Sequence, residues 1–236
     1  MTPTSQTQNA LSCPAPTTSD DAKNFLLVHR FDRDAPTPNH RLHMEDFAQI
    51  IGVDPSLKYK GNYAAIGQAI LDKSYLGEED VFELLRRIKI NELLGNRDAH
   101  MKNFSLLYTD PQRAKLSPAY DVVAYSAYYG GSGHALFFTA AQKEKQLLTP
   151  AIIRDLSNIW GISEVKMSAV VAETVDRAMT KWPALIEDLP FKDNQRENVI
   201  KRLNENPSAI AWTSRNNRRT KTNQKPDVAA TKRPGL

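Results

Sequence analysis

Cysteine is nearly absent from this sequence of 236 residues. Cys13 is the only one, so the chain can form neither an internal disulfide nor a cysteine metal cluster. No apolar run approaches the roughly 18 residues that a transmembrane helix needs. The first residues, MTPTSQTQNALSCPAPTTSDD, lack the basic start and the continuous apolar segment of a secretory signal. We therefore expect a protein of the reducing cytoplasm with no membrane partner.

An excess of one charge sign is missing from most of the chain. The formal net charge is +4, but residues 213–236 contain seven basic residues and one acid, so the other 212 residues together carry −2. A basic segment of this kind can hold phosphate backbones without sequence preference. Its Asn, Thr, Pro and Lys content is, however, typical of a solvated end. We expect residues 209–236 to form a basic disordered tail, which suggests direct nucleic-acid binding only weakly.

The remaining patterns predict an α+β protein in which helices predominate. Residues 1–22 are rich in Thr, Ser, Pro and Gln and are expected to be a disordered leader, followed by one domain over residues 23–208. The apolar run 25–28 predicts a buried strand, and 104–108 predicts a second short strand. Apolar spacing predicts helices over residues 44–51, 63–71, 81–94, 149–160, 163–182 and about 193–205.

The helix over residues 81–94 has the strongest signals. Asp80 is expected to cap its amino end, and Glu83 completes a variant of the capping box. An apolar stripe follows along one face, and Gly95 suits the carboxyl end.

The nine residues after this helix, GNRDAHMKN (95–103), hold an unusual density of functional side chains. Asp98 and Asn103 have the D-x-x-x-x-N spacing of kinase catalytic loops. In such loops the Asp accepts the proton of the attacking hydroxyl and the Asn oxygen helps to hold Mg²⁺. His100 falls where many such enzymes place a cation near the transferred phosphate. The alternative is a helix end with a turn and incidental charges.

A second carboxylate, Asp121, follows within the sequence AYDVV (119–123). The chain between Asn103 and Asp121 has room for two short strands joined by a turn, and such a hairpin can return Asp121 to Asn103. Kinase-like folds place a metal-binding acid after the second strand, where it bridges Mg²⁺ to the nucleotide phosphates. Alone, an Asp before two valines is usually a turn residue; the ordered pair of motifs is far more specific.

These segments resemble the HipA family of bacterial toxin kinases, the serine/threonine kinases of type II toxin–antitoxin modules. The resemblance covers most of the chain from about residue 25 to residue 206. Its motifs are VHRFDR (28–33), HMEDF (43–47), KY (58–59), GNRDAHMKNF (95–104), PAYD (118–121) and GGSG (130–133).

The resemblance implies a protein-kinase-like large lobe that uses ATP and Mg²⁺ on a protein substrate, commonly with a HipB-like DNA-binding antitoxin as partner. It assigns adenine binding to the backbone of the hinge, and catalysis and nucleotide and metal binding to side chains of the later motifs. The hinge residues are His29, Arg30 and Phe31. The catalytic residues are Asp98 and His100, the further nucleotide contacts are His100 and Lys102, and the metal ligands are Asn103 and Asp121.

The sequence also departs from the family pattern. A kinase needs a small lobe with a phosphate-covering loop and a strand lysine. Only about 24 residues precede the hinge strand here, whereas an independent lobe needs at least about 50. Lys23 sits on the hinge strand itself and is a poor substitute, and Met44 replaces a glutamine often seen in its motif. We therefore expect the large lobe alone, either inactive or completed by a separately encoded small lobe.

Two alternatives stay open at the level of sequence. One is a catalytically dead binding module that still engages an antitoxin or a substrate, which the missing phosphate clamp favours. The other is a small-molecule phosphotransferase, which shares the D-x-x-x-x-N spacing but not the RFDR and EDF segments. The three polar residues Asp98, Asn103 and Asp121 favour the kinase.

Overall fold

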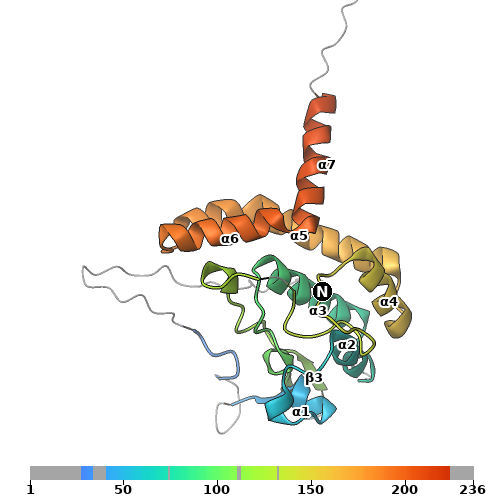
Figure 1. Ribbon diagram of the computed structural model, residues 1–236. Helices are drawn as coiled ribbons and strands as arrows, with labels where there is room; N and C mark the ends of the chain where they lie inside the picture. Colours follow the sequence, from blue (N-terminus) through green and yellow to red (C-terminus); the bar gives the residue numbers. More distant parts are fainter. Residues whose placement is uncertain (1–27, 34–40, 74, 111–112, 132, 224–236) are drawn as a thin grey trace, which may run out of the picture.

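The computed structural model describes residues 28–33, 41–73, 75–110, 113–131 and 133–223, with side chains as far as Arg218. The fold is α+β and mostly helical, as expected from the sequence (Figure 1). The strands are β1 (His43–Asp46), β2 (Ser105–Asp110) and β3 (Arg113–Leu116), and the helices are α1 (Phe47–Ile51), α2 (Tyr63–Leu71), α3 (Glu78–Leu93), α4 (Pro150–Trp160), α5 (Glu164–Asp188), α6 (Asp193–Glu205) and α7 (Pro207–Asn223).

The three strands form one antiparallel sheet in the order β1–β2–β3. Glu45 of β1 is opposite Leu106 of β2, and Leu106 is in turn opposite Leu116 of β3. Leu106 and Leu116 are buried, so the hairpin β2–β3 has one face in the core. The hairpin begins directly after the catalytic-loop motif and ends shortly before Asp121. The predicted hairpin is therefore present.

Short polar residues begin several of the helices. The side chains of Asp46, Asn62 and Thr149 accept hydrogen bonds from backbone N–H groups in the first turns of α1, α2 and α4. They satisfy donors that a helix leaves unpaired at its amino end. The bounds expected for α2, α4 and α6 from apolar spacing are confirmed to within one residue.

Two expected boundaries are wrong at the amino ends of helices. Residues Met44–Asp46 belong to β1, because they pair with β2, and the helix begins only after Asp46. The second error concerns α3, which begins at Glu78, two residues before Asp80. Gly77 is the N-cap residue, and the Asp80 carboxylate accepts a hydrogen bond from its N–H at 3.0 Å. Asp80 therefore satisfies a donor from inside the first turn rather than from the cap position.

Two further expectations are wrong near the carboxyl end. Helix α5 continues through Pro183 to Asp188, and Ile186 in this extension is buried against the second core. The part of the expected disordered tail that is described, residues 209–223, belongs to α7. Ala209 is buried, and the Trp212 indole N–H donates to the Asp176 carboxylate at 2.7 Å. Tertiary packing overrides the polar composition here. The expected leader, residues 25–27 of the strand expected at 25–28, and residues 224–236 lie outside the described part. Val28, the last residue of that expected strand, is exposed and belongs to no strand, so the expectation is wrong there.

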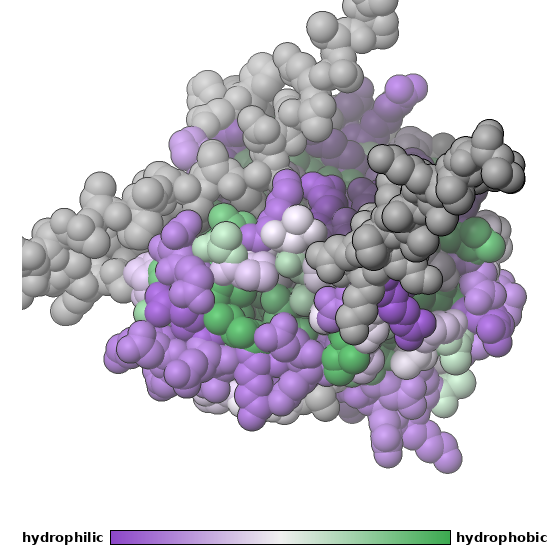
Figure 2. Space-filling model, turned by 90° about the horizontal axis from the view of Figure 1, so that it is seen from above, coloured by the Kyte–Doolittle hydropathy of each residue, from purple (hydrophilic) through white to green (hydrophobic). Residues whose placement is uncertain are grey.

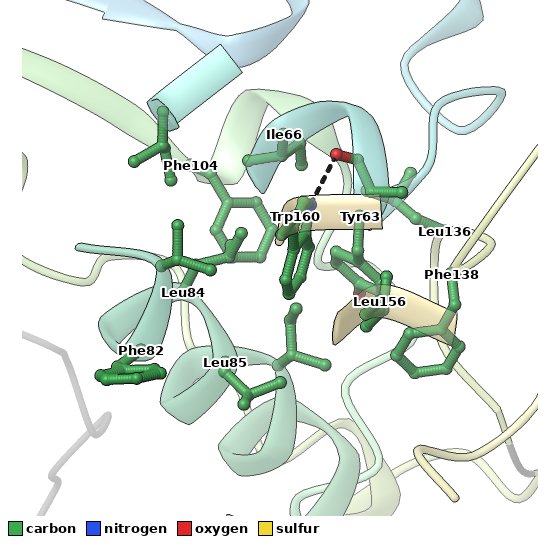
Figure 3. Packing of buried hydrophobic residues seen from close by; sticks show 14 of the residues in the cluster. Tyr63, Ile66, Phe82, Leu84, Leu85, Phe104, Leu136, Phe138, Leu156 and Trp160 are labelled. Carbon is green, nitrogen blue, oxygen red and sulfur yellow. Dashed lines mark hydrogen bonds between the residues drawn. The ribbon is translucent and has the colours of Figure 1, made fainter. Parts of the chain in front are cut away.

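The main core lies between α2, α3, α4 and the sheet (Figure 3). Trp160 of α4 points toward α2, and its indole N–H donates to the Ala64 carbonyl at 3.0 Å. A Cβ on Gly67 would lie 2.4 Å from the Trp160 ring, so only glycine allows this approach. The residues labelled in Figure 3 are Tyr63, Ile66, Phe82, Leu84, Leu85, Phe104, Leu136, Phe138, Leu156 and Trp160.

A second core joins the end of α3 to the second half of α5 and to α6 and α7. Figure 1 shows α5 and α6 lying across α3, with α7 projecting from them. The buried residues of this core include Leu93, Val175, Val199 and Leu203. Helix α3 therefore contributes to both cores and ends between them, which fixes the start of the loop at residues 95–103. No helix in the described part of the chain is both long and apolar enough to span a membrane.

Candidate active site

Asn96 organises the loop that follows α3. Its amide nitrogen donates to the Asn91 side-chain oxygen at 2.8 Å and to the Asp121 carbonyl at 3.3 Å. Its amide oxygen accepts a hydrogen bond from the backbone N–H of Asp98 at 3.1 Å. Because Asn96 is buried, these bonds are well protected from water. One side chain thus ties the loop both to α3 and to the segment that carries Asp121.

The hairpin brings Asp121 to Asn103. The Asn103 amide nitrogen lies 2.5 Å from Asp121 Oδ2, and the Asn103 amide oxygen accepts from the His100 N–H at 3.1 Å. Among the described residues Asp121 is the one non-glycine residue with a positive φ, 55°. Asp tolerates this region better than most residues, and such conformations cluster at functional sites. The two side chains predicted to share a metal are therefore in direct contact.

Asp98 lies on the surface of the same loop, with an exposed side chain. One of its carboxylate oxygens, Oδ1, accepts a short hydrogen bond from the Tyr59 hydroxyl. This bond raises the pKa of Tyr59 to about 12, with a smaller contribution from burial. An exposed carboxylate can be reached by a hydroxyl of another molecule, as a catalytic base must be.

His100, where the sequence analysis expected a cation near the transferred phosphate, is buried. Burial lowers the pKa of its imidazole, and the positive charge of Lys58 lowers it further. Its Nδ1 atom has no hydrogen-bond partner within the described residues. Lys102, the other predicted nucleotide contact on this loop, has an exposed side chain, and its carbonyl accepts from the Tyr120 hydroxyl at 2.6 Å.

The predicted hinge lies beside this loop. The Phe31 and Tyr120 rings are 5.9 Å apart between centroids, and Tyr120 directly precedes Asp121. The Arg30 side chain turns to Asp32, with Nη2 and Oδ2 separated by 2.7 Å. The Arg30 side chain is thus engaged, whereas His29 is exposed. The segment with the hinge candidates His29–Phe31 therefore lies beside Tyr120, the residue next to Asp121 in the sequence.

Arg97 connects the loop at residues 95–103 to the segment after Asp121. Its Nη2 donates to the Gly130 carbonyl at 2.6 Å, and its guanidinium lies 5.4 Å from the Tyr125 ring centroid. Gly131 has a φ of 113°, and a Cβ there would lie 2.6 Å from Arg97 Nη1. Only glycine fits this position without moving the arginine. Arg97 thus holds the segment at residues 125–131 against the loop, together with Ser126, whose hydroxyl donates to the Leu94 carbonyl at 2.8 Å.

The donor set fits a magnesium ion held partly by its nucleotide. Asp121 supplies a carboxylate, an oxygen ligand of the kind Mg²⁺ prefers, and Asn103 supplies an amide oxygen, which here accepts from the His100 N–H and would turn toward the metal. Mg²⁺ commonly uses one or two protein ligands with phosphates and water. In the part of the chain that is described, no three His, Cys, Asp or Glu side chains converge on a metal-sized site. A fully protein-made metal cage is therefore not present there.

A buried polar network surrounds Glu92 at the carboxyl end of α3, directly before the loop at residues 95–103. Glu92 of α3 is 1% exposed, and its carboxylate accepts from Lys89 at 2.5 Å, His134 at 2.9 Å, the Leu148 N–H at 2.5 Å and Asn206 at 3.0 Å. Burial opposes ionisation, but the hydrogen bond from His134 and the charge of Lys89 outweigh it and bring the pKa of Glu92 to about 2. The network joins α3 to the segment before α4, which carries His134 and Leu148, and to Asn206, which lies between α6 and α7.

The candidate site is separate from the main groove of the molecule. A groove of about 470 Å³ lies elsewhere, between α4, α5 and α7, and its lining includes Ile153, Val171 and Ala211 but none of the candidate site residues. Seen from the side of α5–α7, hydrophilic residues surround a smaller apolar area (Figure 2).

Four residues that the sequence reasoning did not assign belong to this arrangement: Tyr59, Asn96, Arg97 and Glu92. Tyr59, Asn96 and Arg97 lie within the quoted motifs, so their position was a usable signal. Glu92 lies inside a helix and has no motif. Only the fold shows that its neighbours His134 and Asn206, far away in sequence, meet it.

Comparison with solved structures finds a protein with a similar fold. Similarity extends to Shewanella oneidensis MR-1 HipA, which was solved in a complex with HipB and operator DNA. The TM-score is 0.61 at 20% identity, over 79% of this chain and 47% of that chain. The helical lobe, the small sheet and the corner at residues 98–121 define a protein-kinase-like large lobe. Residues 6–182 match the HipA-like C-terminal domain family. The chain belongs to this family.

Sequence comparison adds relatives that carry kinase names. A Sinorhizobium fredii protein named "Putative kinase Y4dM" is 37% identical over 167 residues, which cover 70% of this chain and 40% of that protein. A second S. fredii protein, named "Putative kinase Y4mE", is 39% identical over 121 residues, which cover 49% of this chain and 29% of that protein. The chain thus spans less than half the length of these relatives.

Proposed function

We propose that this chain is the catalytic large lobe of a HipA-like serine/threonine protein kinase that transfers the γ-phosphate of ATP to a protein hydroxyl. One observation carries the proposal. Asp98 is exposed on the same loop whose Asn103 contacts Asp121 at 2.5 Å, so the residues proposed as base and as metal ligands lie close together. Family membership and the kinase names of the relatives agree with it.

Each side chain has a defined part in this reaction. Asp98 accepts the proton of the acceptor hydroxyl while that oxygen bonds to the γ-phosphorus and ADP leaves. Asn103 and Asp121 would hold Mg²⁺, which when bound neutralises phosphate charge. The backbone of His29–Phe31 would bind adenine. His100, whose imidazole Nδ1 has no hydrogen-bond partner among the described residues, would contact the nucleotide phosphates together with Lys102.

The partners are part of the proposal. The described residues include no glycine-rich loop over phosphates and no strand lysine of the kind a kinase small lobe supplies. We propose that such a lobe completes the site, in a longer polypeptide or from a separate gene, and that the chain without it binds Mg-ATP weakly. The similarity of the fold to a HipA solved with HipB supports a HipB-like antitoxin as a further partner.

Phosphotransfer is tested by incubating the purified chain with Mg²⁺ and ATP labelled on the γ-phosphate, with and without the products of neighbouring genes. The proposal expects labelled protein in at least one combination. The absence of label in all of them, with antitoxin binding intact, would instead support a binding module without catalytic activity.

Replacing Asp121 with Asn should weaken Mg²⁺ binding. The substitution keeps the size of the side chain but removes a charged oxygen ligand from a hard cation. We expect the Mg²⁺ concentration for half-maximal phosphotransfer to rise about tenfold or more, because even groups outside the ligand set typically change metal affinity by about 10-fold. The measurement is a Mg²⁺ titration at saturating ATP. Asp193→Asn, an exposed carboxylate on α6, is the control and should leave the titration unchanged.

A further inference from the structure

The Tyr59 hydroxyl is the group that contacts the candidate base. It donates to Oδ1 of Asp98, whereas no described residue donates a hydrogen bond to Oδ2. Tyr59 lies in the connection before α2, and this connection is bound to the catalytic loop because the Met101 N–H donates to the Lys58 carbonyl at 3.3 Å. The contact thus joins two segments that are 39 residues apart in sequence and are already fixed to each other.

Neighbouring side chains fix the Tyr59 ring. The buried His100 ring meets it edge-on with centroids 5.1 Å apart. The ammonium groups of Lys58 and Lys145 lie 5.0 and 5.6 Å from its centroid. Cation–π and edge-to-face contacts of this kind restrict an aromatic ring. Although the Tyr59 ring is 38% exposed, these contacts restrict it and so restrict the carboxylate that its hydroxyl binds.

We infer that Tyr59 is a positioning residue of the phosphotransfer reaction. By binding Oδ1, it orients the Asp98 carboxylate so that Oδ2 is the oxygen that accepts the proton of the acceptor hydroxyl. This role rests on the phosphotransfer proposed above. It goes beyond that proposal because a residue outside the D-x-x-x-x-N loop then determines which oxygen acts as the base. Tyr59 contacts neither nucleotide nor metal in this account, so its effect passes entirely through Asp98.

The first test is Tyr59→Phe, which keeps the ring and removes the hydroxyl. Hydrogen bonds to charged groups are typically worth enough to change a rate by about 10- to 100-fold. We expect kcat to fall by about that factor, with the KM for ATP and the melting temperature unchanged. Tyr108→Phe is a matched control, because its hydroxyl also donates to a carboxylate, that of Glu45 at 2.5 Å, but between strands β1 and β2. It should leave kcat unchanged.

A double-mutant cycle separates positioning from an independent role. Residues that act through one another show non-additive effects. In an Asp98→Asn background, Tyr59→Phe should therefore change the residual rate by less than about twofold. A full additional loss in that background would overturn the inference, as would a single Tyr59→Phe variant with the wild-type kcat.

A titration tests the contact without reference to activity. In the full chain labelled with ¹³C at tyrosine Cζ, the Tyr59 signal should titrate near pH 12, because Asp98 holds its proton. In Asp98→Asn both the charge and the strong acceptor are lost, so the titration should move down toward the ordinary value of about 10. An unchanged titration would overturn the contact itself. If the wild-type chain transfers no phosphate in any combination, the proposed function falls and the positioning role falls with it. If it does transfer phosphate, the Tyr59 variants test the role alone.

Discussion

Asp98→Asn should lower the rate of phosphotransfer by about 10²- to 10⁴-fold, the range typical of general-base catalysis. The substitution preserves the size of the side chain and an oxygen that can accept from Tyr59. It removes the charge that makes the carboxylate a proton acceptor. The measurement is kcat for transfer from labelled ATP, with the chain in the combination of partners that gives the highest wild-type rate.

Stability serves as the control for this variant. The Asp98 side chain is exposed, and its bond to Tyr59 lies at the surface, so the melting temperature should change little. Antitoxin binding should survive as well, because the fold is intact. A variant that keeps the wild-type kcat would exclude Asp98 as the base. A variant that unfolds would show that the loop depends on this carboxylate for its structure.

Glu92→Gln should destabilise the fold by about 3–5 kcal/mol, the usual effect of breaking a buried ion pair from one side. Glu92 and Lys89 are almost fully buried, and their side chains are 2.5 Å apart. Glutamine keeps the shape but leaves the Lys89 ammonium without a counter-charge in the core. It also places an N–H₂ group where His134 or Asn206 now donates. Urea unfolding followed by circular dichroism measures the loss.

The matched control is Glu173→Gln on α5. Glu173 pairs with Arg177 at 3.9 Å, but both side chains are more than half exposed, and exposed pairs of this kind contribute little. The free energy of unfolding of the Glu173→Gln variant should therefore stay within about 0.5 kcal/mol of that of the wild type. Equal stability of the Glu92 and Glu173 variants would contradict the supporting role of the buried network.

The same carboxylate should make stability depend on acid pH. The pKa of Glu92 is lowered to about 2 in the fold, below its value in the unfolded chain. The contribution of ionised Glu92 to the free energy of unfolding is therefore fully present above about pH 4.5, and it is lost as the pH falls toward 2. Wild-type protein should lose stability over that window more steeply than Glu92→Gln. Parallel pH profiles for the two proteins would exclude this source of acid sensitivity.

Much of the fold could be predicted because local signals and packing agree. The helices at residues 63–71, 150–160 and 193–205 have polar caps or a regular apolar spacing, and both survive in the structure. The failures have long-range causes. Residues 44–46 became a strand because β2 offers them backbone partners, and α7 formed because Ala209 and Trp212 pack onto other helices. Neither cause is visible in a short window of sequence.

The candidate site shows the same division. The spacing of Asp98 and Asn103 and the expected hairpin were sufficient to predict the contact between Asn103 and Asp121. The lowered pKa of His100 could not be predicted, because it depends on burial and on Lys58 from another segment. The role proposed for Tyr59 likewise depends on a contact across 39 residues. Motif spacing therefore places groups along the chain, while their protonation and orientation are set by neighbours that only the fold brings together.

The most direct measurement compares phosphoprotein formation by the wild-type chain with that by the Asp98→Asn, Asp121→Asn double variant. Both proteins are incubated with Mg²⁺ and γ-labelled ATP, together with the same neighbouring gene products. The account predicts label in the wild-type reaction, almost none with the double variant, and equal binding of the antitoxin by both. Label that persists undiminished with the double variant would contradict the assignment of phosphotransfer to this corner of the molecule.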